Sequence, residues 1–188
     1  MMQFSRCSSG AALAFLAACS SQSSIKPAEV LDEGTGITVE ELHKPLVLTQ
    51  GTNNLPTKGK HISFAYLGPV EWDRSGTPSY GLWVHIAPGN DWHFDSIQMA
   101  GTLTLVLDDG PTVLKMIDPP QLSHGAYRPV ASWGQTAYFD ADIPLLKRMA
   151  GSENIELDVK AGRGAPVRFA ASPAARQALA RYVAAQGY

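Results

Sequence analysis

The sequence predicts a mainly β domain with antiparallel strands in a β-sandwich-like arrangement, completed by a short helix and a C-terminal amphipathic helix. Two observations support this fold class. From Ile37 onward, apolar residues recur with a period of two between turns rich in Gly, Pro and Asn, which is typical of strands with one buried face. Two later segments carry helix-capping signals instead. An α+β fold with a bent antiparallel sheet is the alternative.

Two strand pairs are indicated most clearly. Residues 102–107 alternate Leu with Thr or Val, a tight turn follows at Asp108-Asp109-Gly110, and residues 112–117 return the chain. Residues 155–159 alternate apolar and charged side chains and lead through a glycine-rich loop to Val167 and Phe169. Both patterns predict antiparallel pairs with one face on a core.

The middle of the chain predicts a central strand next to a connection. Residues 80–86 are apolar on both faces, with Trp83 and His85 on one face, so we expect this strand to lie centrally. Residues 69–76 read instead as a polar connection ending in Ser75-Gly76.

Both helices are predicted from their ends. Asp142 can cap a short helix that starts at Ile143-Pro144 and ends at Gly151. Ser172-Pro173 starts a second helix that runs to Gln186. This second helix places one apolar stripe on the core, made of Ala175, Leu179, Tyr182 and Val183.

The first eighteen residues have the pattern of an export signal. Residues 1–10 contain Arg6 and no acidic residue, and residues 11–18 are apolar throughout. Such a run is too short for a helix that crosses a bilayer, which needs about 20 residues, and the small residues Ala17 and Ala18 suit a signal peptidase. We therefore expect residues 1–18 to be a cleaved signal peptide.

The segment Leu16-Ala17-Ala18-Cys19 resembles the lipobox of bacterial lipoproteins. The resemblance covers only the signal region and implies that Cys19 carries a diacylglycerol and becomes the new N-terminus, often with a further fatty acid such as palmitate. Two chains suffice for stable membrane anchoring. By analogy with enterobacterial sorting, Ser20 after the cysteine implies the outer membrane, with the protein facing the periplasm.

The mature chain is predicted to be one domain. Residues 19–36 would form the acylated cysteine and a flexible tether, because serines dominate its first part, and residues 37–188 would form a single β-rich domain. Cys19 is the only cysteine left after cleavage, so the fold contains no internal disulfide. Lys and Arg number 15 against 17 Asp and Glu, without a basic stripe, which argues against nucleic-acid binding.

No motif with a built-in catalytic mechanism is present in the sequence. The nearest metal-binding pattern is Asp91, His93 and Asp95, with His85 from the preceding strand as a fourth ligand. Imidazole and carboxylate ligands suit zinc or manganese. A polar turn after Pro88-Gly89 accounts for the same residues, and on that interpretation the protein has no metal cofactor.

Aromatic side chains suggest a binding surface instead. We expect Trp72 in its polar connection, with Asp73 and Arg74 beside it, and Trp92 in the following loop to be the binding residues. An ordinary aromatic core is the alternative. Glu40 and Glu41 are strand neighbours that point to opposite faces, and both are expected to be solvated.

These observations favour a binding protein over an enzyme. The sequence predicts a periplasmic lipoprotein, held on the membrane through Cys19, that acts as a binding or accessory subunit of an envelope assembly with another envelope protein as its partner. A metal-assisted hydrolase acting on envelope material is one alternative. An inhibitor or immunity lipoprotein is another.

Overall fold

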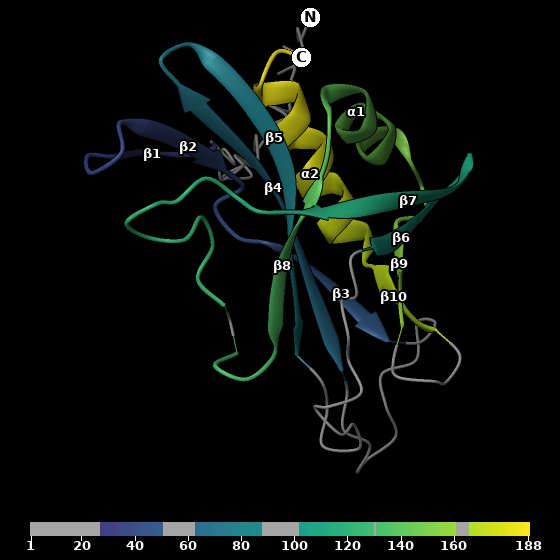
Figure 1. Cartoon of the computed structure of the whole chain (residues 1–188). Helices are drawn as coiled ribbons and strands as arrows, with labels where there is room; N and C mark the ends of the chain where they lie inside the picture. Colours follow the sequence, from purple (N-terminus) through teal and green to yellow (C-terminus); the bar gives the residue numbers. More distant parts are fainter. Residues whose placement is uncertain (1–26, 51–62, 88–101, 130, 161–165) are drawn as a thin grey trace, which may run out of the picture.

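The structure is a computed structural model that describes residues 27–50, 63–87, 102–129, 131–160 and 166–188. The described residues form ten strands and two helices (Figure 1). In chain order these are β1 (Ala28–Asp32), β2 (Ile37–Glu41), β3 (Leu46–Gln50), β4 (Phe64–Arg74), β5 (Thr77–Ala87), β6 (Thr102–Leu107), β7 (Gly110–Ile117), β8 (Gln135–Asp140), α1 (Ile143–Gly151), β9 (Glu156–Val159), β10 (Val167–Ala171) and α2 (Pro173–Ala185).

The strands form one antiparallel sheet that closes into a barrel. Its order is β1-β2-β4-β3-β10-β9-β6-β7-β8-β5, and β5 pairs back onto β4. The first half of β4 pairs with β3 and its second half with β2, so the β1–β2 hairpin extends the sheet beyond the ring. The predicted mainly β fold with a C-terminal helix is confirmed, and its sandwich-like packing takes the form of a closed sheet.

The two predicted strand pairs are confirmed. β6 pairs with β7 across the Asp108-Asp109 turn, and β9 pairs with β10; the glycine-rich loop between β9 and β10 falls largely outside the described residues. The central strand is also confirmed, because β5 lies between β4 and β8. Its Trp83 and His85 share one face, as the pattern predicts.

The predicted connection at residues 69–76 is wrong, because β4 continues through it to Arg74 and turns only at Ser75-Gly76. Both turn residues have positive φ, 55° and 81°, which suits a tight hairpin turn. Val70 and Trp72 alternate with Glu71 and Asp73, and this period of two continues the strand through a segment that is polar in composition.

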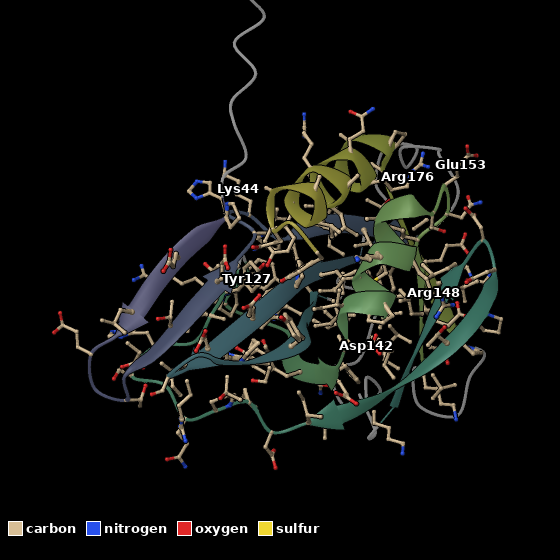
Figure 2. The ribbon with its side chains drawn as sticks, turned by 90° about the horizontal axis from the view of Figure 1, so that it is seen from above. Lys44, Tyr127, Asp142, Arg148, Glu153 and Arg176 are labelled. Atoms are coloured by element: carbon tan, nitrogen blue, oxygen red, sulfur yellow. The ribbon has the colours of Figure 1, made fainter. Side chains whose placement is uncertain are left out.

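The barrel interior is aliphatic and closed. Completely buried side chains inside it come from seven strands and include Leu48, Leu67, Leu82, Leu105, Phe139, Leu157 and Phe169. Both helices lie side by side at one end of the barrel (Figures 1 and 2), and they pack on each other. Leu146 and Met149 of α1 and Leu179 and Tyr182 of α2 are at most 1% exposed.

Both predicted helix caps are confirmed. The Asp142 carboxylate accepts a hydrogen bond from the Leu145 amide at 2.8 Å, and the Ser172 hydroxyl accepts one from the Ala175 amide at 3.2 Å. Neither helix in the described part of the chain has the length and hydropathy needed to cross a membrane.

A second layer of side chains lies on the outer face of β4, β5 and β8. We call it the outer aromatic layer: Tyr66, Trp72, Trp83, His85, Tyr127 and Tyr138. Consecutive rings in this layer lie 5.0 to 5.9 Å apart. The segment between β7 and β8, which we call the β7–β8 connection, supplies Tyr127, whose ring lies so close to Gly68 that a Cβ there would be 2.4 Å from it. This glycine is therefore required for the layer to close.

The folded domain begins earlier than the sequence predicts. Residues 28–32, assigned above to the tether, form β1 and pair with β2. Val30 stands opposite Val39, and the Asp32 carboxylate is bound by Ser123. Partners distant in sequence therefore order a stretch whose composition alone indicates flexibility.

Candidate binding cleft

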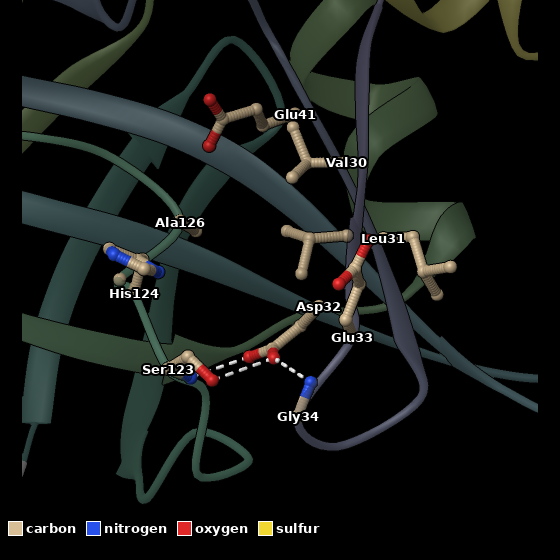
Figure 3. A pocket seen from close by; sticks show the side chains of 11 residues that line it. Val30, Leu31, Asp32, Glu33, Gly34, Glu41, Ser123, His124 and Ala126 are labelled. Carbon is tan, nitrogen blue, oxygen red and sulfur yellow. Dashed lines mark hydrogen bonds between the residues drawn. The ribbon is translucent and has the colours of Figure 1, made fainter.

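A cleft of about 340 Å³ lies between the β1–β2 hairpin and the β7–β8 connection. Figure 3 shows its lining side chains. They are Val30, Leu31, Asp32, Glu33, Gly34, Val39 and Glu41 from the hairpin, and Ser123, His124, Gly125 and Ala126 from the connection. The cleft is thus formed by two segments about 90 residues apart in sequence, as the contact between Asp32 and Ser123 illustrates.

Asp32 fixes one end of the cleft. Its carboxylate accepts hydrogen bonds from the Ser123 amide at 2.5 Å, the Ser123 hydroxyl at 2.8 Å and the Gly34 amide at 3.0 Å. These bonds, those from Ser123 above all, hold the pKa of Asp32 below its usual value. Both carboxylate oxygens of Asp32 are therefore engaged in positioning the walls.

Tyr127 fixes the connection directly after the lining residue Ala126. Its buried hydroxyl accepts a hydrogen bond from the Leu42 amide at 2.8 Å and donates one to the Pro69 carbonyl at 2.8 Å. The ring packs on Trp83 with centroids 5.0 Å apart. Because one hydroxyl satisfies two backbone groups from different segments, the connection is fixed against β2 and β4 at this point.

Glu41 is a lining residue whose carboxylate is only partly satisfied. It follows Ile37 and Val39 on the same face of β2, so its side chain points toward the layer below the connection, where the residue is half-buried. Its Oε2 atom is buried and has no hydrogen-bond partner among the described residues. Burial raises the pKa of Glu41 to about 7. The expectation that Glu41 is solvated is wrong, and the alternation with Ile37 and Val39 is the signal that indicates its position.

The rim of the cleft is apolar and open. Val30 and Leu31 of β1 are 58% and 59% exposed, and among the described strands β1 ends the sheet order, with β2 as its one neighbour. Glu33 adds a third carboxyl group to those of Asp32 and Glu41 among the lining residues. A binding region with aliphatic walls and net negative charge results.

The predicted binding residues around Trp72 occupy different environments. Trp72 is only 3% exposed and packs on Tyr138 with centroids 5.7 Å apart. The Asp73 carboxylate accepts a hydrogen bond from the Gly76 amide at 2.6 Å in the β4–β5 turn, while Arg74 is exposed at the end of β4. Trp72 borders an open hollow of about 810 Å³ beside Tyr80, but with so little exposed surface it offers no stacking platform. The prediction of an accessible indole here is wrong. Trp92 lies outside the described residues.

The predicted metal ligands are not brought together in the described residues. His85 is 2% exposed, stacks on Trp83 and forms a 2.8 Å hydrogen bond between Nδ1 and the Thr136 hydroxyl. Burial lowers its pKa. Asp91, His93 and Asp95 lie outside the described residues. Among the described residues, no group of three or more His, Cys, Asp or Glu side chains could hold a metal ion. Zinc or manganese binding stays a prediction.

Searches of known protein families, of curated proteins and of solved structures find no match to this chain. Inference about function therefore starts from the residues of the cleft and of the signal region.

Proposed function

We propose that the protein is a bacterial lipoprotein, anchored through an acylated Cys19 on the periplasmic face of the outer membrane, whose domain binds another envelope protein as an accessory subunit. The observation that carries the proposal is the lipobox Leu16-Ala17-Ala18-Cys19, placed directly before a short polar segment and a folded domain. An acyl anchor supplies the membrane contact without a spanning helix.

The tether restricts where the domain can act. Only residues 20–27 separate Cys19 from the start of β1. Even fully extended, eight residues span at most about 30 Å. An anchored domain would therefore stay next to the bilayer with β1 close to it, which favours contact with a membrane-bound or membrane-adjacent partner.

Strand β1 is the surface that we propose the partner contacts. An edge strand presents unpaired N–H and C=O groups, and proteins usually protect such edges with Lys, Pro or a bulge. β1 contains no Lys, Pro or bulge; its charged residues are Glu29 and Asp32, and between them it exposes Val30 and Leu31. Addition of a partner strand to a free sheet edge is a recurrent mode of peptide recognition, so β1 has the features of a binding edge.

Crosslinked co-purification from native membranes tests this function. The wild-type lipoprotein and a Cys19→Ala variant would be crosslinked in cells, purified and compared by mass spectrometry, which also identifies the acyl group on Cys19. We expect one envelope protein in stoichiometric amount with the wild type and at least tenfold less with the variant. An unacylated Cys19, or equal recovery from both chains, would refute the proposal. A secreted toxin or lytic enzyme as the partner would establish the inhibitor alternative instead.

A further inference from the structure

We infer that the cleft beside β1 receives the lysine or arginine side chain of an extended partner segment, with Glu41 as its counter-ion. This inference rests on the proposed function and specifies what the partner must carry. Glu41 would select a cationic residue at one position of the partner strand.

The strand geometry places such a side chain over the cleft. Neighbouring strands lie about 4.8 Å apart, so a segment paired with β1 would run about 10 Å from β2. Its alternate side chains would share the face of Val30, Val39 and Glu41, which the β1–β2 register places on one side of the sheet. A long side chain from that strand and the Glu41 side chain together can bridge this distance.

The charge of the cleft selects a cation. Glu41 Oε2 is buried and has no hydrogen-bond partner in the described part of the chain, whereas both oxygens of Asp32 are already occupied by Ser123 and Gly34. The described salt bridges involve Arg148 and Arg168, and neither reaches Glu41. An ionised carboxylate that is buried without a partner is costly, so a cation that pairs with Glu41 removes that cost.

The walls of the cleft suit an aliphatic stem. Val30, Val39 and Ala126 line the path between the rim and Glu41. Lysine and arginine bury their methylene stems on apolar surface while the charged end reaches a polar group. Anionic groups such as phosphate are disfavoured, because Glu33 and Glu41 contribute two carboxylates to the lining.

Two small probes test the inference on the full lipoprotein in detergent. N-acetyl-lysine N-methylamide represents one residue of the partner strand, and N-acetyl-norleucine N-methylamide is the same molecule without its amine. We expect the lysine probe to shift the NMR signals of Val30 and Ala126 and to bind at least tenfold more tightly than the norleucine probe. Glu41→Gln should abolish the difference. Glu29→Gln, which removes a charge from an exposed residue of β1 that does not line the cleft, should preserve it.

The pH dependence provides a second readout. Since Glu41 must ionise to pair with a cation and burial raises its pKa to about 7, affinity for the lysine probe should rise about tenfold from pH 6 to pH 8. Other titratable groups face this region: Asp32, Glu33 and His124 in the lining, and Tyr127, Tyr138 and Tyr182 near the carboxylate. A His124→Gln variant distinguishes titration of the His124 imidazole from titration of Glu41. In this variant the affinity for the lysine probe should still rise between pH 6 and pH 8.

Equal binding of the two probes, or a lysine preference that persists in Glu41→Gln, would overturn the inference. A shift of the cleft signals by bicelles containing phosphatidylethanolamine, without any by the lysine probe, would assign the cleft to a lipid amine and also overturn it. Failure of the proposed function has a different signature. If the lysine preference requires Glu41 but the lipoprotein captures no envelope protein, the proposed function is refuted. The assignment of Glu41 as the cation-binding group of the cleft would then still stand.

Discussion

The barrel interior and the outer aromatic layer are both buried, yet they are built on different chemistry. Inside the barrel, aliphatic side chains and Phe139 and Phe169 fill a closed space, and most of them have no exposed surface. Outside it, aromatic rings pack beneath a long connection that is fixed by single hydroxyl and carboxylate groups. The interior depends on shape and volume, while the outer layer depends on a few polar contacts.

This difference indicates where binding can develop. Among the described residues, six buried polar atoms have no hydrogen-bond partner. Glu41 Oε2, Trp72 Nε1 and His85 Nε2 lie in or beside the outer layer, the other three lie on α2 and its C-cap, and none belongs to a strand residue of the barrel interior. Such groups cost stability and are tolerated where a stable core compensates. The interior provides stability, and the cleft that we propose binds the partner lies beside the outer layer, next to Tyr127 in the chain.

The largest effect is expected from Phe139→Ala in the barrel interior. Phe139 is completely buried in β8, and the variant should lose about 3 to 5 kcal/mol of unfolding free energy in urea titrations. Val113→Ala, at a 63% exposed aliphatic residue of β7, is the control and should cost less than about 0.5 kcal/mol. Equal costs would contradict the assignment of the interior as the stability core.

Tyr127→Phe should have the next largest effect, and a more local one. Without the hydroxyl, the Leu42 amide and the Pro69 carbonyl lose their buried partner, which costs about 1 to 3 kcal/mol. Hydrogen exchange should accelerate at Leu42 and in residues 122–129, while the barrel strands stay protected. Uniform acceleration across the barrel would mean that the two regions are not separable.

Glu41→Gln should stabilise the protein, but only at neutral and alkaline pH. The folded-state pKa of about 7 lies above the ordinary value of 4.5, so wild-type stability falls as the pH rises from 4.5 to 7 and stays reduced above that range. The variant avoids this loss and should gain about 1 to 3 kcal/mol at pH 8 with no gain at pH 4.5. Thermal unfolding of both chains across this range is the measurement, and a gain that is independent of pH would contradict burial of an ionising Glu41.

Asp32→Ala should have the smallest effect on global stability, because this carboxylate is exposed. Loss of its bonds to Ser123 should accelerate hydrogen exchange at Ser123 and leave the melting temperature nearly unchanged. The pKa of Asp32 is lowered, so its stabilising contact is present above the ordinary value of 3.8 and is lost as the pH falls through the still lower folded pKa. A wild-type chain that keeps Ser123 protected below that pKa would contradict the role of the carboxylate.

Prediction from the sequence worked where local patterns suffice. The alternating Leu residues of β6, the charged and apolar alternation of β9, and the caps at Asp142 and Ser172 each specify their element within a few neighbours. The second half of β4 was missed because Glu71 and Asp73 make its composition polar, although Val70 and Trp72 keep the period of a strand.

The cleft was not predictable in the same way. Its walls meet through contacts between Asp32 and Ser123 and between Leu42 and Tyr127, which are 91 and 85 residues apart. Neither segment has a pattern of its own that indicates the other. The face of Glu41 was available from the alternation of β2, but the absence of a partner for its carboxylate follows only from the packing of β1, β2 and the connection.

Site-specific photo-crosslinking tests the central claim most directly. A photo-reactive amino acid would be placed at Val30 in the acylated protein in its native envelope, and at the equally exposed Val113 as the control. The account predicts one envelope protein crosslinked at Val30 and not at Val113, through an extended segment that contains a lysine or arginine. No adduct at Val30, or the same adducts at both positions, would contradict the proposal that β1 and its cleft bind the partner.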